Sequence, residues 1–424
     1  MPKKKGITDS IIDNDFDNSS VVSICSSDDS NRLSELCDEL QISNPLDNVE
    51  SKIDNLKSKR PDTRIKYLNE LNKCLQISHL GIGSNWRYFS TLIDGLLFSI
   101  EHGTGLDRTI AAHSLSLLAF QFCKVDIIDV LEQVSSKLER LLKDSSLDVN
   151  FRSACCSAIA DLLWMSSSDD YSQVNEVIIQ FMVIFKGSCL KGDGKSPVNS
   201  GPIVDFHENA LHCWFRLLTL LPNNMTVSLC KGSIPILFSI LQNSNVQIRI
   251  ASAQVIGLVY EQIRVLADET FKGNEYRDIL QTVQSFSVDN MKNKSKNDRK
   301  KQRLTMRNVY RYLQTGADTP IMVKISNGEN LELTSLIEQF HYDCVCETLK
   351  IGVNKHLRGN PQVRDIFELG PVIFEGGLES KPEKQFNKIQ KKYEHQFVSK
   401  VRKEHLNNSR SLKQQFNDSF VGEE

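Results

Sequence analysis

Through most of the chain, hydrophobic residues recur at intervals of three and four, the spacing that places them on one face of an α-helix. The first clear helix begins at Pro61, because proline suits a first helical turn, and Ile65, Leu68, Leu71 and Leu75 follow on one face. Almost no strand pattern appears before residue 289, so the region is predicted to be helical. Further helices are expected over residues 87–101, 105–122, 127–143, 148–166, 171–186, 203–221, 231–242, 245–268 and 274–289.

Several of these helices repeat one short pattern. Arg108, Arg152 and Arg249 are each followed by small residues three and four positions later and by a large aliphatic residue at position seven. A looser copy occupies residues 208–221. The first two arginines are 44 residues apart, within the ~40–47-residue period of HEAT and armadillo repeats. The 97 residues to the third leave room for two units and a loop. The sequence thus predicts an all-α, armadillo/HEAT-like α-solenoid, with an irregular helical domain as the alternative.

The repeat alignment also predicts which residues face the core. Trp214 should be inside, together with Leu217, Leu218 and Leu221. Of the eleven cysteines, several sit in apolar helical contexts and are interpreted as small core residues in a reducing compartment. These are Cys123, Cys155, Cys156 and Cys213.

The pattern changes after residue 316. Apolar residues alternate with polar ones on both sides of Asn327 and Gly328, a dipeptide typical of a β-hairpin turn. Ser335 and Glu338 then form a capping box that begins a helix to about residue 350. A short helix is expected after Pro361. The alternating apolar residues are Val323, Ile325, Leu331 and Leu333.

These patterns divide the chain into five expected parts. They are a disordered acidic Ser-rich tail (1–48), a helical-repeat domain (49–290), a basic helix (291–316), a hairpin-plus-helix C-terminal domain (317–375), and a linker with a basic C-terminal helix (376–424).

Charge is distributed unevenly, although the net charge is only −2. Residues 6–50 contain eleven acidic residues and one basic residue, whereas residues 292–311 contain nine basic residues and one acidic residue. Such asymmetry favours a polyanionic or acidic partner for the basic segments.

The basic helix has two functional faces in this interpretation. Met306, Val309, Tyr310 and Leu313 form an apolar stripe that should dock it on the solenoid. Arginines at strict i,i+4 spacing form a neighbouring row, and arginine suits phosphate because its planar fork bonds oxygens in pairs. A solvated face and a nuclear import signal are the alternatives. The candidate phosphate-binding residues here are Arg299, Lys300, Lys301, Arg303, Arg307 and Arg311.

The expected C-terminal helix repeats this arrangement beside an apolar stripe that begins at Phe386. Its composition favours RNA or an acidic partner over a membrane surface. The candidate residues are Lys384, Lys388, Lys391, Lys392, Lys400, Arg402 and Lys403.

Three short stretches contain residue types of catalytic or metal sites, but their spacing argues against such sites. "KGDGKS" (191–196) lacks the earlier glycine and the preceding strand of a phosphate-binding loop. The histidines of "HENALH" (207–212) lie about 140° apart on a helix, too far apart to share a zinc ion. "HYDCVC" (341–346) has no second cluster to complete four ligands. We therefore predict no enzyme activity, cofactor or metal, and interpret His113 and His212 as structural residues with satisfied hydrogen bonds.

No apolar run reaches the ~18–20 residues needed to cross a bilayer. The N-terminal lysines are not followed by the apolar segment of a secretory signal. The protein is therefore expected to be intracellular.

"SKNDRKKQRLTMRNVYRYLQTG" (295–316) and "NPQVRDIFELGPVI" (360–373) together resemble the interferon-related developmental regulator family. The order of the parts also matches over roughly residues 50–410. The resemblance implies an armadillo-type fold without catalysis and roles in differentiation. Members act as transcriptional co-regulators and as ribosome-bound repressors of translation, in which a C-terminal helix enters the RNA channel. The family usually ends in a dense basic segment, whereas this chain has "NNSRSLKQQFNDSFVGEE".

The expected function is therefore non-enzymatic binding of ribosomes through rRNA, with repression of translation. The alternative is a nuclear scaffold that joins transcription factors to co-repressor complexes. The expected locations are the cytoplasm and the nucleus, with no membrane and no small-molecule substrate.

Overall fold

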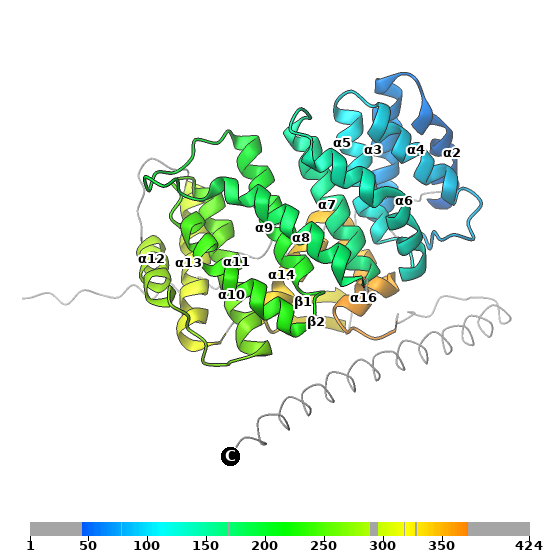
Figure 1. Cartoon of the computed structure of the whole chain (residues 1–424). Coiled ribbons are helices and arrows are strands. Elements are labelled where there is room, and N and C mark those ends of the chain that lie inside the picture. Colours follow the sequence, from blue (N-terminus) through cyan, green and yellow to red (C-terminus); the bar gives the residue numbers. More distant parts are fainter. Residues whose placement is uncertain are drawn as a thin grey trace, which may run out of the picture. The chain divides into compact units, whose positions relative to one another are not determined.

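The computed structural model describes residues 45–371, except residues 78, 168–169, 289–295, 318 and 327–328. Within this range the chain is almost entirely helical (Figure 1). The elements are α2 (Pro45–Ile53), η1 (Asp54–Lys57), α3 (Pro61–Ile77), α4 (Phe89–His102), α5 (Leu106–Ala119), α6 (Lys124–Lys143), α7 (Val149–Ser166), α8 (Tyr171–Phe185), η2 (Lys186–Ser188), α9 (Gly201–Leu218), α10 (Asn223–Leu241), α11 (Val246–Leu266), α12 (Tyr276–Val288), α13 (Lys296–Thr315), β1 (Ile321–Ser326), β2 (Glu329–Leu333), α14 (Leu336–Leu349), η3 (Lys350–Gly352), α15 (Val353–Gly359) and α16 (Pro361–Ile366).

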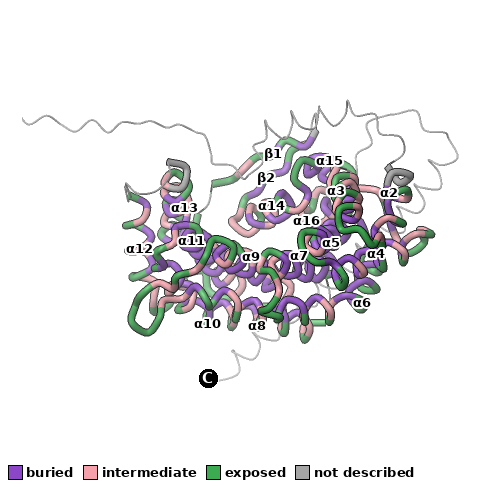
Figure 2. The backbone as a smooth tube through the Cα atoms, turned by 90° about the horizontal axis from the view of Figure 1, so that it is seen from above, coloured by how far each residue is buried: buried purple, intermediate pink, exposed green. Residues whose placement is uncertain are grey.

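The helices are arranged in two rows that curve together. Figure 2 shows α3, α5, α7, α9, α11 and α13 along the inner side of the curve, and α4, α6, α8, α10 and α12 along the outer side. Each inner helix packs on the next inner helix, and from α5 onward each also packs on the outer helix that precedes it in the chain. Serial packing of helix pairs is the architecture of an α-solenoid, which confirms the predicted fold class.

The recurring arginine joins neighbouring repeats. Arg108 stacks on the ring of Phe151, 4.4 Å from its centroid, and its Nε donates to the Ile100 carbonyl oxygen of the preceding outer helix. Arg152 makes the equivalent stack on Phe206 at 5.0 Å. One guanidinium thus hydrogen-bonds to a carbonyl oxygen near the end of an outer helix and stacks on a ring of the following inner helix. This geometry explains why the same position holds arginine in successive units.

The predicted core residues are inside. Trp214 is fully buried, and Leu217, Leu218 and Leu221 are buried beside it. Small side chains recur where inner helices approach each other, and these are buried too. They include Ala111, Ala112, Cys155, Cys156, Ser252 and Ala253.

Cys123 corrects the interpretation of the cysteines, because it is exposed. Helix α5 ends at Ala119, earlier than predicted, and the buried positions that follow belong to Phe120 and Phe122. Cys123 instead precedes α6 as its N-cap residue, and its Sγ donates to Asp126 Oδ2 at 2.9 Å. Cys155, Cys156 and Cys213 are buried as predicted.

Helix α10 begins at Asn223, eight residues before the predicted start. Gly232 and Pro235 lie inside it, and both residues weaken the sequence signal for a helix. Of the described helices, α10 is the one long and apolar enough to span a membrane by length and composition. Its buried residues, Cys230 and Leu237 among them, pack in the helical core, chiefly on α11.

The predicted hairpin and capping box are confirmed. Strands β1 and β2 pair antiparallel, with Val323 opposite Leu331 and Ile321 opposite Leu333. The Ser335 side chain accepts a hydrogen bond from the Glu338 backbone N–H, and the Glu338 carboxylate accepts one from the Ser335 backbone N–H. The short helix α16 follows Pro361 as predicted, whereas α2 and α15 were not predicted.

The hairpin and α14–α16 lie against the inner side of the curve (Figure 2). Helix α14 contacts α11 near one end of the array and α3 and α5 near the other. At the first end, the Glu261 carboxylate of α11 accepts hydrogen bonds from the backbone N–H groups of Leu336 and Ile337. At the other, Asn360 Nδ2 donates to the Phe120 carbonyl oxygen at 2.7 Å. The chain therefore covers part of its own concave surface.

Candidate functional site

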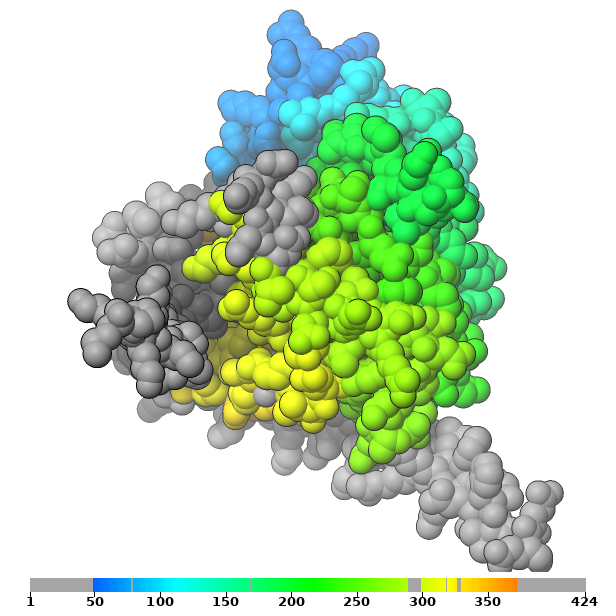
Figure 3. Space-filling model, turned by 90° about the vertical axis from the view of Figure 1, so that its left-hand side faces the viewer, coloured from blue at the N-terminus to red at the C-terminus, as the bar shows by residue number. Residues whose placement is uncertain are grey.

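Helix α13 carries the described candidate cations and lies at the end of the array, beside α12 (Figure 3). Met306, Val309 and Leu313 are buried, as the apolar stripe predicted, while Tyr310 is half-buried. Tyr312 is also buried, on the edge of the same stripe. The helix is thus docked through one face, and its opposite face is free to carry charge.

Buried polar side chains that the sequence analysis missed fix the position of α13. The Arg249 guanidinium stacks on Phe286 of α12 and donates to Gln302 Oε1 at 3.0 Å. At the other end of α13, Arg264 donates to the carbonyl oxygens of Tyr312 and Leu313. The Leu313 carbonyl is one that a helix C-terminus leaves without an intrahelical partner, whereas the Tyr312 carbonyl also accepts from the Gly316 backbone N–H. The sequence signal for such a contact was Gln302, because it is a polar residue on the apolar face of α13.

The six candidate cations of α13 do not share one face. Lys300, Lys301, Arg307 and Arg311 are exposed, whereas Arg299 and Arg303 are half-buried. A residue four positions on is turned by about 40° around a helix, so the i,i+4 row begins beside the docked side at Arg299 and turns away from it toward Arg311. Arg303 Nε donates to the Arg299 carbonyl oxygen at 3.3 Å, which holds that side chain along the helix.

Three of the exposed cations form a straighter line. Lys300, Arg307 and Arg311 are separated by seven and four positions, so they fall within about 40° of one another and extend over about 16 Å. We call them the outward stripe. None of the three makes an ion pair with the residues that the structure describes. Lys301 points to a different side, close enough to the Glu208 carboxylate to act on its pKa.

The seven candidate cations of the C-terminal helix, from Lys384 to Lys403, lie outside the described residues. The same holds for the acidic tail up to residue 44.

The inner side of the array holds a second group of charged residues, around α14. Arg216 of α9 and Asp161 of α7 form an ion pair at 2.6 Å with almost no exposed surface. Glu347 and Lys350, from the end of α14, border the same polar region. His212 corrects an interpretation, because its Nε2 is buried and has no hydrogen-bond partner among the described residues. Within the described residues, no group of three side chains is arranged to hold a metal ion.

Three histidines, two of them buried and His341 half-buried, should make the fold sensitive to acid. Burial lowers the pKa of His207, His341 and His356 to about 4, from about 6.5 in an unfolded chain. Neutral His356 accepts a hydrogen bond at Nδ1 from Asn360 Nδ2, 2.9 Å away, and that atom cannot accept once protonated. Between pH 6.5 and about 4, the unfolded state therefore binds more protons than the folded state.

We expect the free energy of unfolding to fall as the pH is lowered from about 6.5 to 4. Each such histidine contributes about 1.4 kcal/mol per pH unit within this window. Denaturant unfolding at several pH values should therefore show a shallower pH dependence for His356→Asn, by about one proton. The same change at His102, an exposed histidine on α4, is the control and should leave the slope unaltered. A His356 variant with the full slope would contradict the assignment.

Comparison with known proteins gives the family. The family model for interferon-related developmental regulators matches residues 18–314, more than half of the chain. A second model, the interferon-related protein conserved region, matches residues 360–414. The chain belongs to the interferon-related developmental regulator family.

Individual relatives are distant in sequence. Interferon-related developmental regulator 1 of Homo sapiens is 25% identical over 284 residues, which is 67% of this chain and 62% of the relative. Interferon-related developmental regulator 1 of Sus scrofa is 24% identical, over 62% of its length, and interferon-related developmental regulator 2 of Mus musculus is 26% identical, over 64%. The matched region thus spans less than two thirds of these curated relatives. The family resemblance predicted from the two sequence motifs is confirmed.

Proposed function

We propose that this interferon-related developmental regulator binds ribosomes through rRNA phosphates and represses translation, without catalysis. The outward stripe of α13 carries the proposal. Three cations spaced along about 16 Å repel one another, and an anionic strand alongside them removes that cost. Arg307 and Arg311 present guanidinium forks that bond phosphate oxygens in pairs. The proposed locations are the cytoplasm, where ribosomes act, and the nucleus.

The geometry of the helix favours a large, rigid polyanion. Buried side chains hold α13 at both ends, through Gln302 at one and the Tyr312 and Leu313 carbonyls at the other. Its cations are therefore presented on a fixed scaffold, which reduces the entropy lost on binding.

The test is the salt dependence of ribosome and rRNA binding by the full chain. We expect the triple variant Lys300→Gln, Arg307→Gln, Arg311→Gln to reduce the slope of log affinity against log salt by about two, because each lost phosphate contact removes about 0.7–0.9. Sucrose-gradient sedimentation at low salt should show less of this variant with ribosomes. Glutamine keeps the helix, since its propensity is close to that of arginine and lysine.

Two further variants make the test specific. The triple change Lys59→Gln, Arg60→Gln, Lys66→Gln removes three exposed cations at the other end of the array, and the slope should stay unchanged. The double change Arg299→Gln, Arg303→Gln should reduce the salt slope by less, because both residues are half-buried. An unaltered slope in the folded outward-stripe variant would eliminate α13 and leave the basic segment predicted at residues 384–403 as the remaining contact. Wild-type protein that stays at the top of a low-salt gradient would refute ribosome binding.

A second candidate is the nuclear co-regulator scaffold. Its support is an apolar strip on the outer helix α8, where Ile179 and Val183 are exposed one turn apart, at 51% and 67%. A helical repeat with such a strip suits a protein partner. If this candidate is correct, Ile179→Ser with Val183→Ser should abolish co-repressor recruitment in a reporter assay, whereas the outward-stripe variant should not.

A further inference from the structure

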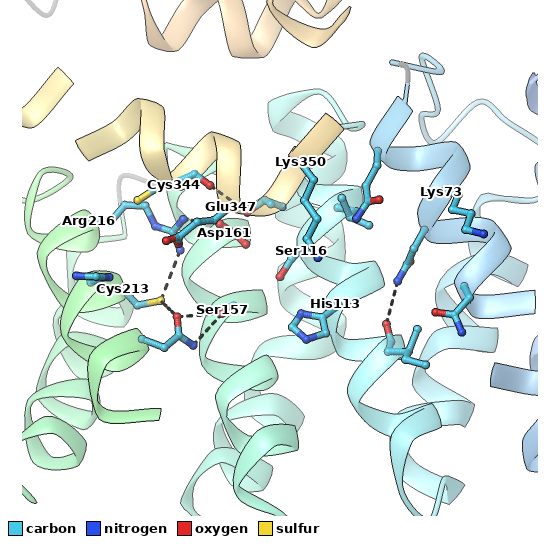
Figure 4. A pocket seen from close by; sticks show the side chains of 18 residues that line it. Lys73, His113, Ser116, Ser157, Asp161, Cys213, Arg216, Cys344, Glu347 and Lys350 are labelled. Carbon is cyan, nitrogen blue, oxygen red and sulfur yellow. Dashed lines mark hydrogen bonds and ion pairs between the residues drawn. The ribbon is translucent and has the colours of Figure 1, made fainter. Parts of the chain in front are cut away.

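A cavity of about 400 Å³ lies on the inner side of the array, between α3, α5, α7 and α9 and the C-terminal end of α14 (Figure 4). Its volume falls within the ~300–1,000 Å³ of sites that bind small molecules. Its lining is mostly polar, in contrast to the apolar packing around it. No residue of α13 contributes to it, so it is separate from the basic interface.

The two ends of the cavity differ in charge. Figure 4 shows Lys73 on α3 at one end, Glu347 with the Asp161–Arg216 pair toward the α9 end, and Lys350 between them, above His113. Three permanent cations and two carboxylates give the lining a net charge of +1. Glu347 makes no hydrogen bond or ion pair with the described residues. A ligand that complements these walls has an anionic group at one end and a cationic group at the other.

Some buried polar atoms in the lining have no hydrogen-bond partner among the described residues. They include His212 Nε2 and Arg216 Nε. Arg216 is only 4% exposed. Because unpaired buried polar groups are costly, such atoms are usually bonded to solvent or to a ligand. The Arg216 Nε–H is therefore a donor that a ligand in this cavity can use.

Lys350 adds a conformational argument. Its φ of 49° and ψ of −120° belong to a region that is favourable for glycine alone. Two residues on, Gly352 lies so close to the Gln76 carbonyl oxygen that an added Cβ would be 1.6 Å from it. The turn is therefore fixed against α3, and its strained position carries a long cationic side chain into the cavity wall. Strain of this kind concentrates at functional sites.

We propose that this cavity binds a small organic molecule of net charge −1, with an oxyanion toward Lys350 and Lys73 and an ammonium group toward Glu347. This is the chemistry of an acidic amino acid. The oxyanion accepts charge-assisted hydrogen bonds from the two lysines, and the ammonium donates to the free carboxylate. The unpaired Nε–H of Arg216 donates to the middle of the molecule. The site is a ligand site within a non-catalytic protein.

The test is calorimetric titration of the full chain with three probes. L-glutamate carries both groups, glutarate lacks the ammonium, and inorganic phosphate is an oxyanion alone. We expect glutamate to bind saturably and about tenfold more tightly than glutarate, as one charge-assisted pair implies. Glu347→Gln should remove the preference for glutamate and leave glutarate binding unweakened. Lys350→Gln should weaken glutamate and glutarate alike, by about tenfold.

Lys350→Gly separates binding from folding. Glycine adopts this backbone conformation without strain, so the ligand-free variant should melt at a higher temperature than wild type, yet bind glutamate as poorly as Lys350→Gln. The control, Lys66→Gln, changes an exposed lysine of α3 that does not line the cavity, and this variant should bind normally. The proposal is overturned if no probe binds saturably at millimolar concentration, so that the cavity holds only water, or if both Lys350 variants bind like wild type. Ribosome binding can fail independently, because these variants leave the outward stripe intact.

Discussion

Trp214→Ala should lower the free energy of unfolding by about 3–5 kcal/mol, the usual cost of truncating a large, fully buried aromatic side chain. Trp214 has no exposed surface, and its ring meets Phe185 of α8 edge to face, with 5.5 Å between centroids. The substitution leaves a cavity between the inner helix α9 and the outer helix α8. The two helices cannot both move inward to fill it. Thermal melts should show a fall of roughly 6–15 °C.

Matched variants test the cause. Trp86 is half-buried near the N-terminal end of the array, and its Nε1 donates to Glu50, so Trp86→Ala should cost clearly less. Trp214→Phe keeps a ring and removes an indole N–H that has no partner among the described residues. Its cost should be well below that of alanine. A melt of Trp214→Ala that coincides with wild type would contradict the assignment of the core face.

Asp161→Ala should cost about 3–5 kcal/mol, because it leaves the Arg216 guanidinium buried without a counter-charge. The two side chains are 2% and 5% exposed. Burial raises the pKa of the Asp161 carboxyl even though Arg216 opposes this, so the pair does not recover its full desolvation cost. Chemical denaturation of the ligand-free protein measures the loss.

The double variant Asp161→Leu, Arg216→Met should be far more stable than Asp161→Ala, since it removes both charges and fills the same space. Glu101→Ala is the surface control. It breaks the exposed pair between Glu101 and Lys137, whose atoms are 3.1 Å apart, and should cost less than about 1 kcal/mol. If Asp161→Ala and Glu101→Ala cost the same, the buried pair has no special role in stability.

The repeats could be predicted from sequence because each helix carries a local signal. Periodicity predicted most of the helices, and the arginine at 108, 152 and 249 marked equivalent positions. The structure gives the reason, since that side chain stacks on an aromatic ring of a later helix in each case. Local signals also sufficed for the hairpin and the capping box, whose geometry is set within a few residues.

Long-range placement could not be predicted in this way. The apolar face of α14 shows that the helix is buried, but periodicity does not say against what. Its position on the inner side depends on contacts such as Glu261 with Leu336, 75 residues apart. The cavity was missed for the same reason, because Lys73, Asp161 and Lys350 come from separate elements. For α13, the i,i+4 row of arginines could be predicted from sequence. The half-burial of Arg299 and Arg303 follows only from the orientation in which the helix is docked.

The return of α14–α16 across the inner side changes how the protein can fold. In an open solenoid, contacts are local, so folding can begin in any repeat and the ends unravel independently. Here Asn360 bonds to Phe120 across 240 residues, a separation that raises the contact order and slows folding. During synthesis, the first repeats emerge well before the segment that covers them. Until residue 360 has left the ribosome, the bond to Phe120 cannot form, so the array gains its final cooperativity only after these last helices have been synthesised.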